Sequence, residues 1–342
     1  MAFMPSQLIA EILQLNQERA KEFRENQPAR RAFRERHPVE IAVTMCMDGR
    51  VGFSAFADIP FGITNRLRNI GGKYDIGWPM MRATLNDIEE YANSERRATM
   101  LVITYHFSSS DSHLGCKGFG YDTVGAVGYM ERFRAEVKRV YGRRIYPVVV
   151  GIETDCGAFV IHGENGERLE TRTIPEPMVV ASKIHALFPF APESIFNVLV
   201  EIVNGNVAYQ KSQPTCPPED LDHRERVLAI GQGFDWYYSR NSALIIGPCD
   251  PALDKAIAVA ATIIKTNRDT GRIPKDARGV LLVSTPFRRL IDRSGAEEQT
   301  RFLRDFALSV IASDLPEMSD FFEPLAGVLD LRTREFHPLK AE

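Results

Sequence analysis

Two cysteines and a histidine stand at or beyond the ends of apolar runs in this sequence. Cys46 directly follows the run 41–45, His106 ends the run 100–105, and Cys116 follows further on. Thiolate and imidazole are ligands that zinc prefers, and three protein ligands plus a water are typical of catalytic zinc sites. Zinc lowers the pKa of such a water to about 7. The pattern therefore indicates a catalytic zinc site.

An acidic and a basic residue follow the first thiol at a spacing that lets them pair. They are Asp48 and Arg50, in the segment Cys46-Met47-Asp48-Gly49-Arg50. The planar fork of an arginine can hold a carboxylate through two parallel hydrogen bonds. A structural zinc site closes with four protein ligands and needs no such pair. The pair therefore favours zinc-activated water over a structural metal site.

A second histidine competes for the role of imidazole ligand. His113 precedes Cys116 by three residues, in the compact segment His-Leu-Gly-Cys. His106 ends a predicted buried strand, and rigid elements hold ligands more precisely than loops do. We favour His106 and treat 108–115 as an inserted loop, with His113 as the alternative.

The other cysteines and one further histidine do not belong to this pattern of metal ligands. Cys156 and Cys249 follow predicted strands but have no histidine nearby, so we predict that they lie in the core or at its rim. Cys216 lies among prolines and is predicted to be a loop thiol. His162 alternates with apolar residues in a predicted strand and is interpreted as structural.

The composition is that of a globular protein. The chain has 342 residues, 44% of them hydrophobic and 25% charged, and a formal net charge of -3, which gives no indication of nucleic acid or an anionic membrane as partner. No apolar run approaches the roughly 20 residues that span a bilayer, and residues 1–6 lack the features of a secretory signal. We therefore expect a cytoplasmic protein, in which a disulfide between Cys46 and Cys116 is disfavoured.

Apolar strands and helical patterns alternate from the first thiol onwards. Near-continuous apolar strands separated by helices are typical of an α/β fold with a mostly parallel β-sheet flanked by helices. Ligands of such sheets bind outside the carboxyl ends of the strands. The predicted strands are 41–45, 100–107, 145–152 and 159–162, and the predicted helices are 6–36, 79–96 and 122–141.

The same order of elements recurs in the second half of the sequence, beyond proline-rich stretches at 175–192 and 213–218. The recurring segments are 226–235, 279–286 and 325–331, which stand where 41–48, 99–107 and 157–163 stood, with a helix predicted over 251–266.

The second half lacks the metal ligands of the first. Gly231 or Gln232 falls near the position of the first cysteine, and Thr285 falls near that of the histidine. We therefore predict an internal duplication, a pseudo-dimer with one metal-free copy. The predicted domains are an N-terminal helical arm at 1–38, a zinc-binding catalytic domain at 39–180 and a degenerate copy at 181–342.

These motifs resemble a known family of enzymes. The segment Cys-Met-Asp-Gly-Arg at 46–50 resembles the Cys-x-Asp-x-Arg signature of β-class carbonic anhydrases, and Arg-Asn-Ile-Gly-Gly at 68–72 is similar to their Arg-Asn-x-Gly segment. Residues 105–116 and 151–155 are similar to the carboxysome shell carbonic anhydrases. That divergent branch has a loop inserted between its ligand histidine and second cysteine, and a catalytic half followed by a degenerate half.

The resemblance implies a β-carbonic-anhydrase-like fold and assigns roles to the site residues. Cys46, His106 and Cys116 would hold Zn2+. Asp48 would accept a hydrogen bond from the zinc-bound water, and Arg50 would keep that carboxylate ionised and off the metal. The implied reaction is the reversible hydration of CO2 to bicarbonate.

Two other functions remain open at this point. The same fold is used for CS2 or COS hydrolysis, and a non-catalytic, zinc-containing assembly protein is a further alternative. The Asp48–Arg50 pair argues against the assembly protein, since a structural zinc site needs no such pair.

The resemblance also bears on partners and location. The carboxysomal enzymes carry a longer N-terminal region that engages partners within the shell, whereas here 1–36 precedes the first strand. We expect a free cytosolic enzyme at least as readily as one that binds carboxysome components. A homodimer is also expected, with 6–36 as the arm that embraces a neighbour, because two-fold dimers are the commonest homo-oligomers.

Overall fold

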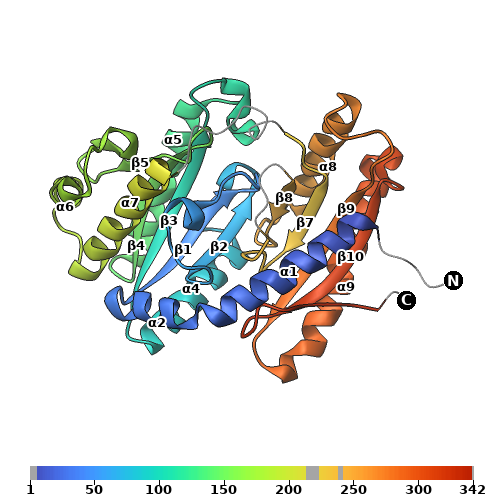
Figure 1. Ribbon diagram of the computed structural model, residues 1–342, viewed down its shortest axis with the longest axis horizontal. Coiled ribbons are helices and arrows are strands. Elements are labelled where there is room, and N and C mark those ends of the chain that lie inside the picture. The colour runs from blue at the N-terminus through green and yellow to red at the C-terminus, as the bar shows by residue number, and fades with distance from the viewer. Residues whose placement is uncertain (1–5, 213–222, 238–241, 341–342) are drawn as a thin grey trace. The chain divides into compact units, whose positions relative to one another are not determined.

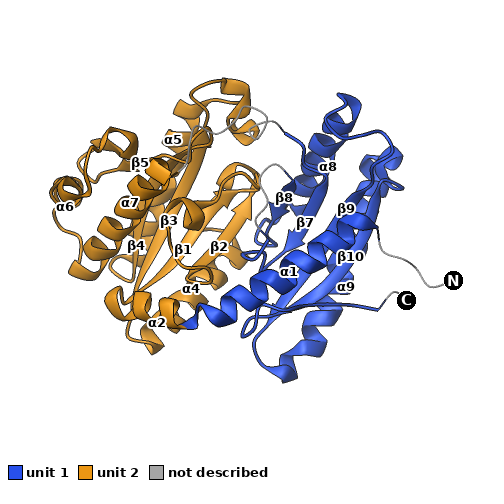
Figure 2. Cartoon of the chain, viewed as in Figure 1, with its two compact units in different colours: residues 1–27, 223–342 blue, residues 28–222 orange. Residues whose placement is uncertain are grey.

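The computed structural model describes residues 6–212, 223–237 and 242–340 (Figure 1). Residues 28–222 form one compact unit, and residues 1–27 with 223–342 form the other (Figure 2). Each unit is built on one mostly parallel β-sheet flanked by helices, so the predicted α/β class is confirmed. Among the described residues, no helix has the length and apolar character that crossing a bilayer demands.

The sheet of residues 28–222 has six strands in the order β2-β1-β3-β4-β5-β6. The first four are parallel, and β5 and β6 are antiparallel. Its strands are β1 (Val39–Cys46), β2 (Thr64–Asn69), β3 (Ala98–Phe107), β4 (Ile145–Glu153), β5 (Phe159–His162) and β6 (Arg168–Glu170). All residues of β1 and eight of the ten in β3 are buried, as expected for strands covered on both faces.

Helices cover this sheet and connect its strands. Contacts join α4 to β1 and β3, α5 to β3 and β4, and α7 to β1 and β3. Asp122 caps α5 by accepting a hydrogen bond from the amide of Gly125, as its position before an apolar helical pattern predicts. The helices are α2 (Gln27–Arg36), α3 (Phe53–Phe56), α4 (Pro79–Ser94), α5 (Thr123–Tyr141), α6 (Val180–Leu187) and α7 (Glu193–Ser212).

The second unit has a five-stranded sheet in the order β11-β10-β9-β7-β8. Its described strands are β7 (Val227–Gly231), β8 (Ala243–Ile246), β9 (Gly279–Phe287), β10 (Phe322–Asp330) and β11 (Phe336–Pro338). Its described helices are α1 (Gln7–Glu25), α8 (Leu253–Asp269) and α9 (Arg293–Asp314). The order β8-β7-β9-β10-β11 repeats β2-β1-β3-β4-β5, with parallel and antiparallel pairs in the same places.

This shared topology supports an internal duplication but corrects one of its predicted correspondences. The segment 325–331 lies in β10, which pairs in parallel with β9 and so takes the place of β4. The prediction that it matches 157–163, the region of β5, is wrong. The counterpart of β5 is the short β11. The predicted domain limits themselves stay a prediction.

The strand register also shifts the predicted counterpart of the histidine. Phe107 pairs with Glu153 at the end of β4, and Phe287 pairs with Asp330 at the end of β10. Phe107 therefore corresponds to Phe287, and His106 corresponds to Pro286 rather than to Thr285.

The counterpart of the first thiol follows from the neighbouring strand pair. Thr44 pairs with Ile103 in the first sheet, and Ile230 pairs with Val283 in the second. When the two sheets are aligned on these pairs, Gln232 corresponds to Cys46. If this alignment continues from Cys46 and Gln232 without a gap, Asp48 and Arg50 correspond to Phe234 and Trp236. Both aromatic side chains are buried. The second unit thus has apolar core where the first has an ion pair.

Two buried asparagines make matching contacts in the two units. Asn206 on α7 donates to the carbonyl of Gly157 at 2.8 Å and accepts from the amide of Phe159 at 3.0 Å. Asn16 on α1 donates to the carbonyl of Arg334 at 2.9 Å and accepts from the amide of Phe336 at 2.8 Å. Gly157 and Arg334 share a positive φ, 72° and 63°.

We expect Asn206→Ala to lower the free energy of unfolding by about 3 kcal/mol, because it leaves two buried carbonyls, of Gly157 and Phe56, without a donor. Asn16→Ala removes fewer bonds and should cost about 2 kcal/mol. Urea denaturation of both variants measures these values. A loss below about 1 kcal/mol for Asn206→Ala would contradict this account.

The helix predicted over 6–36 is two helices. Ser6 caps α1 as expected, but α1 ends at Glu25 and α2 begins at Gln27. Pro28 explains the break, because proline has no amide proton to continue the helical hydrogen bonds. The charged part of this segment also contributes side chains to the core, since Ala20 and Phe33 are buried.

Candidate metal centre

The thiols and the imidazole come from two neighbouring parallel strands and the loop after the second. Cys46 is the last residue of β1, and His106 is the last but one of β3. Because the carboxyl ends of parallel strands meet at one edge of the sheet, these two side chains lie close together. Cys116 returns to the same edge after the loop 108–115. All three residues are buried.

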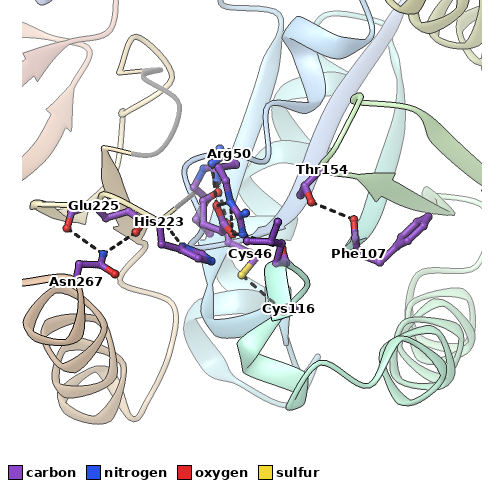
Figure 3. Close-up of polar contacts among 11 residues, drawn as sticks. Cys46, Arg50, Phe107, Cys116, Thr154, His223, Glu225 and Asn267 are labelled. Atoms are coloured by element: carbon purple, nitrogen blue, oxygen red, sulfur yellow. Dashed lines mark hydrogen bonds and ion pairs between the residues drawn. The ribbon is translucent and has the colours of Figure 1, made fainter. Parts of the chain in front are cut away.

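The three side chains form a cluster that fits a metal ion. One ligand atom from each of Cys46, His106 and Cys116 lies within 4.8 Å of the others. The two sulfur atoms are 3.9 Å apart, and a dashed line joins Cys46 and Cys116 in Figure 3. Zinc–sulfur bonds of about 2.3 Å in a tetrahedron require sulfurs about 3.8 Å apart. Both ring nitrogens of His106 are buried without a hydrogen-bond partner, which an ion would supply for one of them.

The two thiols differ in acidity. The hydrogen bond between the two sulfurs, together with burial, raises the pKa of Cys46, whereas the same hydrogen bond lowers the pKa of Cys116. A bound cation deprotonates a ligating thiol outright.

Asp48 and Arg50 form the predicted fork beside the first thiol. Arg50 Nη2 lies 2.6 Å from Asp48 Oδ2, and Nε lies 3.1 Å from Oδ1. The amide of Arg50 also donates to Oδ1, at 2.9 Å. The side chains of Asp48 and Arg50 are only 7% and 3% exposed, so water does not screen this pair.

Comparison with known proteins points to one family. Residues 32–188 match the family model of the carboxysome shell carbonic anhydrase catalytic domain. This match spans the three clustered ligands and the Asp48–Arg50 fork. Over this region the chain is similar to the carboxysome shell carbonic anhydrases.

Individual relatives support the same assignment. The carboxysome shell carbonic anhydrase of Hydrogenovibrio crunogenus is 24% identical over 255 residues, which are 63% of this chain and 48% of the relative. That of Prochlorococcus marinus subsp. pastoris is 25% identical over 239 residues, 58% of this chain and 46% of the relative. The chain therefore spans about half the length of the curated relatives it matches.

The other candidate histidine lies apart from the cluster. The side chain of His113 is 79% exposed and lies 3.3 Å from Asp111. His162 is buried instead against Tyr105, whose hydroxyl lies 3.0 Å from its Nε2. Gly151 makes room for the Tyr105 ring, which would lie 2.5 Å from a Cβ at that position.

The remaining cysteines also lie outside the cluster. Cys156 is half-buried, with its sulfur 3.2 Å from a carboxylate oxygen of Glu153, and burial raises its pKa to about 11. Cys249 is buried in the second unit. Cys216 lies outside the described residues.

Arg68 is a site residue whose role the sequence did not reveal. Its Nη1 donates to the carbonyls of Cys46 and Asp48 at 2.8 and 2.9 Å, and its Nη2 donates to that of Val51. The side chain thus holds the backbone that carries the first thiol and the fork. The Arg-Asn-x-Gly resemblance at 68–72 was the only signal for it.

A glycine in the same segment lets the chain approach the ends of β1 and β3. Gly72 has φ +66°, and a Cβ there would lie 3.1 Å from both the carbonyl carbon of Met45 and the carbonyl oxygen of Thr104. Both the left-handed backbone and this close contact require glycine. The segment therefore packs directly against the strands that carry Cys46 and His106.

Proposed function

We propose that this protein is a zinc-dependent carbonic anhydrase that hydrates CO2 to bicarbonate. The observation that carries the proposal is the buried Cys46–His106–Cys116 cluster with the Asp48–Arg50 fork beside it. Three protein ligands leave a fourth position of a zinc ion for water. The family match and the names of the relatives support the same activity.

The chemistry divides between the metal and the chain. Zinc, when bound, supplies a water that ionises near neutral pH. Asp48 accepts the hydrogen bond of the nucleophile and so orients it toward CO2. Arg50 occupies both carboxylate oxygens of Asp48, which keeps this carboxylate from becoming a fourth ligand.

The test combines elemental analysis with a stopped-flow assay of CO2 hydration. We expect about one zinc per chain and hydration that disappears when zinc is removed and returns when it is restored. Assays with CS2 and COS on the same preparation separate the alternative hydrolase activity. Full zinc content without turnover of any of these substrates would reject the enzyme in favour of an assembly protein.

We also propose that the two sheets are copies of one ancestral unit, of which only the first binds metal. Their shared strand order and the matched contacts of Asn16 and Asn206 support this. An experimental structure whose two halves superpose poorly, or in which Cys216 or Cys249 contacts the metal, would contradict it.

Assembly and location extend the proposal. We propose a homo-oligomer, at least a dimer, because two-fold dimers are the commonest homo-oligomers. We propose that it associates with carboxysomes in the cytoplasm, because the relatives are named carboxysome shell carbonic anhydrases. Light scattering at micromolar concentration should give at least twice the mass of the chain. A strict monomer would reject the oligomer, and absence of the protein from purified carboxysomes would leave the free cytosolic enzyme.

A further inference from the structure

The loop 108–115, between the histidine and the second cysteine, is fastened where it leaves β3. The carbonyl of Phe107 accepts two hydrogen bonds from Thr154, one from its amide at 2.8 Å and one from its hydroxyl at 3.1 Å (Figure 3). Thr154 opens the turn that joins β4 to β5. The start of the loop is therefore tied to that turn.

Asp155, the next residue of the turn, holds the following peptide groups. Its Oδ2 accepts hydrogen bonds from the amides of Ser109 at 2.9 Å and Ser110 at 2.8 Å. Bonds from amides to an ionised carboxylate are stronger than those to a neutral acceptor. One half-buried carboxylate thus fixes two successive residues of an otherwise exposed loop.

Bonds within the loop carry this constraint to its far end. The amide of Asp111 donates to Ser108 Oγ at 3.1 Å, and the amide of Leu114 donates to the carbonyl of Asp111 at 2.9 Å. The amide of Gly115 donates to the carbonyl of Ser112, also at 2.9 Å. Hydrogen bonds within the loop therefore link its start to Leu114 and Gly115 at its far end.

The far end of the loop touches the fork. The carbonyl of Leu114 accepts a hydrogen bond from Arg50 Nη2 at 3.0 Å. The same nitrogen donates to Asp48 Oδ2 at 2.6 Å. The loop therefore supports the guanidinium group that holds Asp48.

Cys116 has anchors of its own beyond the loop. Its carbonyl accepts from the amides of Phe119 at 3.1 Å and Tyr121 at 3.0 Å. Lys73 Nζ donates to the carbonyl of Gly118 at 2.5 Å. Release of the loop therefore leaves the second thiol held.

We propose that Asp155 is a positioning residue for the Asp48–Arg50 fork. It acts through the loop, whose Leu114 carbonyl steadies Arg50, and not through the thiols. This inference rests on the proposed function, in which the fork orients the nucleophile. In this proposal the inserted loop helps to position the Asp48–Arg50 fork and does not only connect His106 to Cys116.

The test uses Asp155→Ala and Asp155→Asn in the full chain. Asp155→Ala removes the acceptor, so the amides of Ser109 and Ser110 should exchange hydrogen faster while zinc stays at about one per chain. Both kcat and kcat/KM should fall by about tenfold, as for other residues that orient a metal site from outside it. Asp155→Asn keeps an oxygen able to accept both amides and should stay within about twofold of wild type.

Asp122→Ala is the matched control. Asp122 is also an aspartate whose carboxylate accepts a backbone amide, that of Gly125 at 2.9 Å, but it caps α5 and lies outside the loop. It should lower stability without lowering kcat per zinc. Wild-type kcat in Asp155→Ala despite faster loop exchange would overturn the proposal. Loss of zinc in step with activity would overturn it too, because the effect would then run through Cys116.

Cobalt substitution tests the route through Arg50 without an activity assay. The visible absorption spectrum of Co2+ bound in place of zinc depends on the ligands of the ion. The spectrum of Asp155→Ala should therefore shift in the same direction as that of Arg50→Ala. The double variant should match Arg50→Ala alone, because residues that act in series are not additive. A wild-type spectrum in Asp155→Ala would overturn the proposal. If wild type hydrated no CO2, the proposed function would fail, while these spectra would still decide whether Asp155 acts on the fork.

Discussion

Cys46→Ala and His106→Ala are expected to abolish zinc binding at the concentrations of an ordinary preparation. Each removes one of three clustered ligand atoms, none of which has a replacement within the cluster. We expect metal affinity to fall by more than about a hundredfold, since even changes outside the ligand set cost about 10- to 100-fold. Elemental analysis of purified variants gives the zinc content.

His113→Ala is the matched control for the imidazole. Its side chain is exposed and lies outside the cluster, so zinc should stay at the wild-type level. Full zinc in His106→Ala together with loss in His113→Ala would move the imidazole ligand to His113.

Removal of zinc by a chelator should also lower the melting temperature, because a ligand at about a thousand times its Kd stabilises the folded state by about 4 kcal/mol.

Asp48→Asn should lower kcat for CO2 hydration by about 10²- to 10⁴-fold while zinc remains bound. The amide keeps the shape of the side chain but loses the charge that pairs with Arg50 and the second acceptor oxygen. Stopped-flow kinetics and elemental analysis of the same sample measure both quantities. Wild-type turnover in this variant would remove the fork from the mechanism.

The second unit supplies a matched control for Asp48→Asn. Asp330 and Arg332 form the same three-residue fork, with Arg332 Nη2 at 2.7 Å from Oδ2 and Nε at 3.1 Å from Oδ1. Burial acts to raise the pKa of Asp330, but hydrogen bonds from Arg332 hold it below its ordinary value. No metal cluster accompanies this fork among the described residues. Asp330→Asn should therefore lower stability and leave kcat per zinc unchanged.

Local patterns predicted several elements almost to the residue. The strand predicted over 159–162 is β5, and the helix predicted to start at Asp122-Thr123 is α5 with Asp122 as its cap. Apolar runs and capping side chains act over a few residues, so the sequence displays them directly. The helices α7 and α9 and the edge strand β8 were not predicted. The order of strands within each sheet depends on pairing over long distances, so no local pattern displays it.

The reactive side chains were predictable from the sequence alone: two thiols, a histidine and an Asp-x-Arg pair, at the ends of buried strands. The folded structure was needed to show that His106 rather than His113 lies in one cluster with Cys46 and Cys116. It alone revealed that Arg68 holds the carbonyls of Cys46 and Asp48, and that the Leu114 carbonyl supports Arg50. The physical reason is that every residue carries a carbonyl, so an acceptor of this kind has no signature in sequence. Its identity depends on which parts of the chain the fold brings within hydrogen-bonding distance.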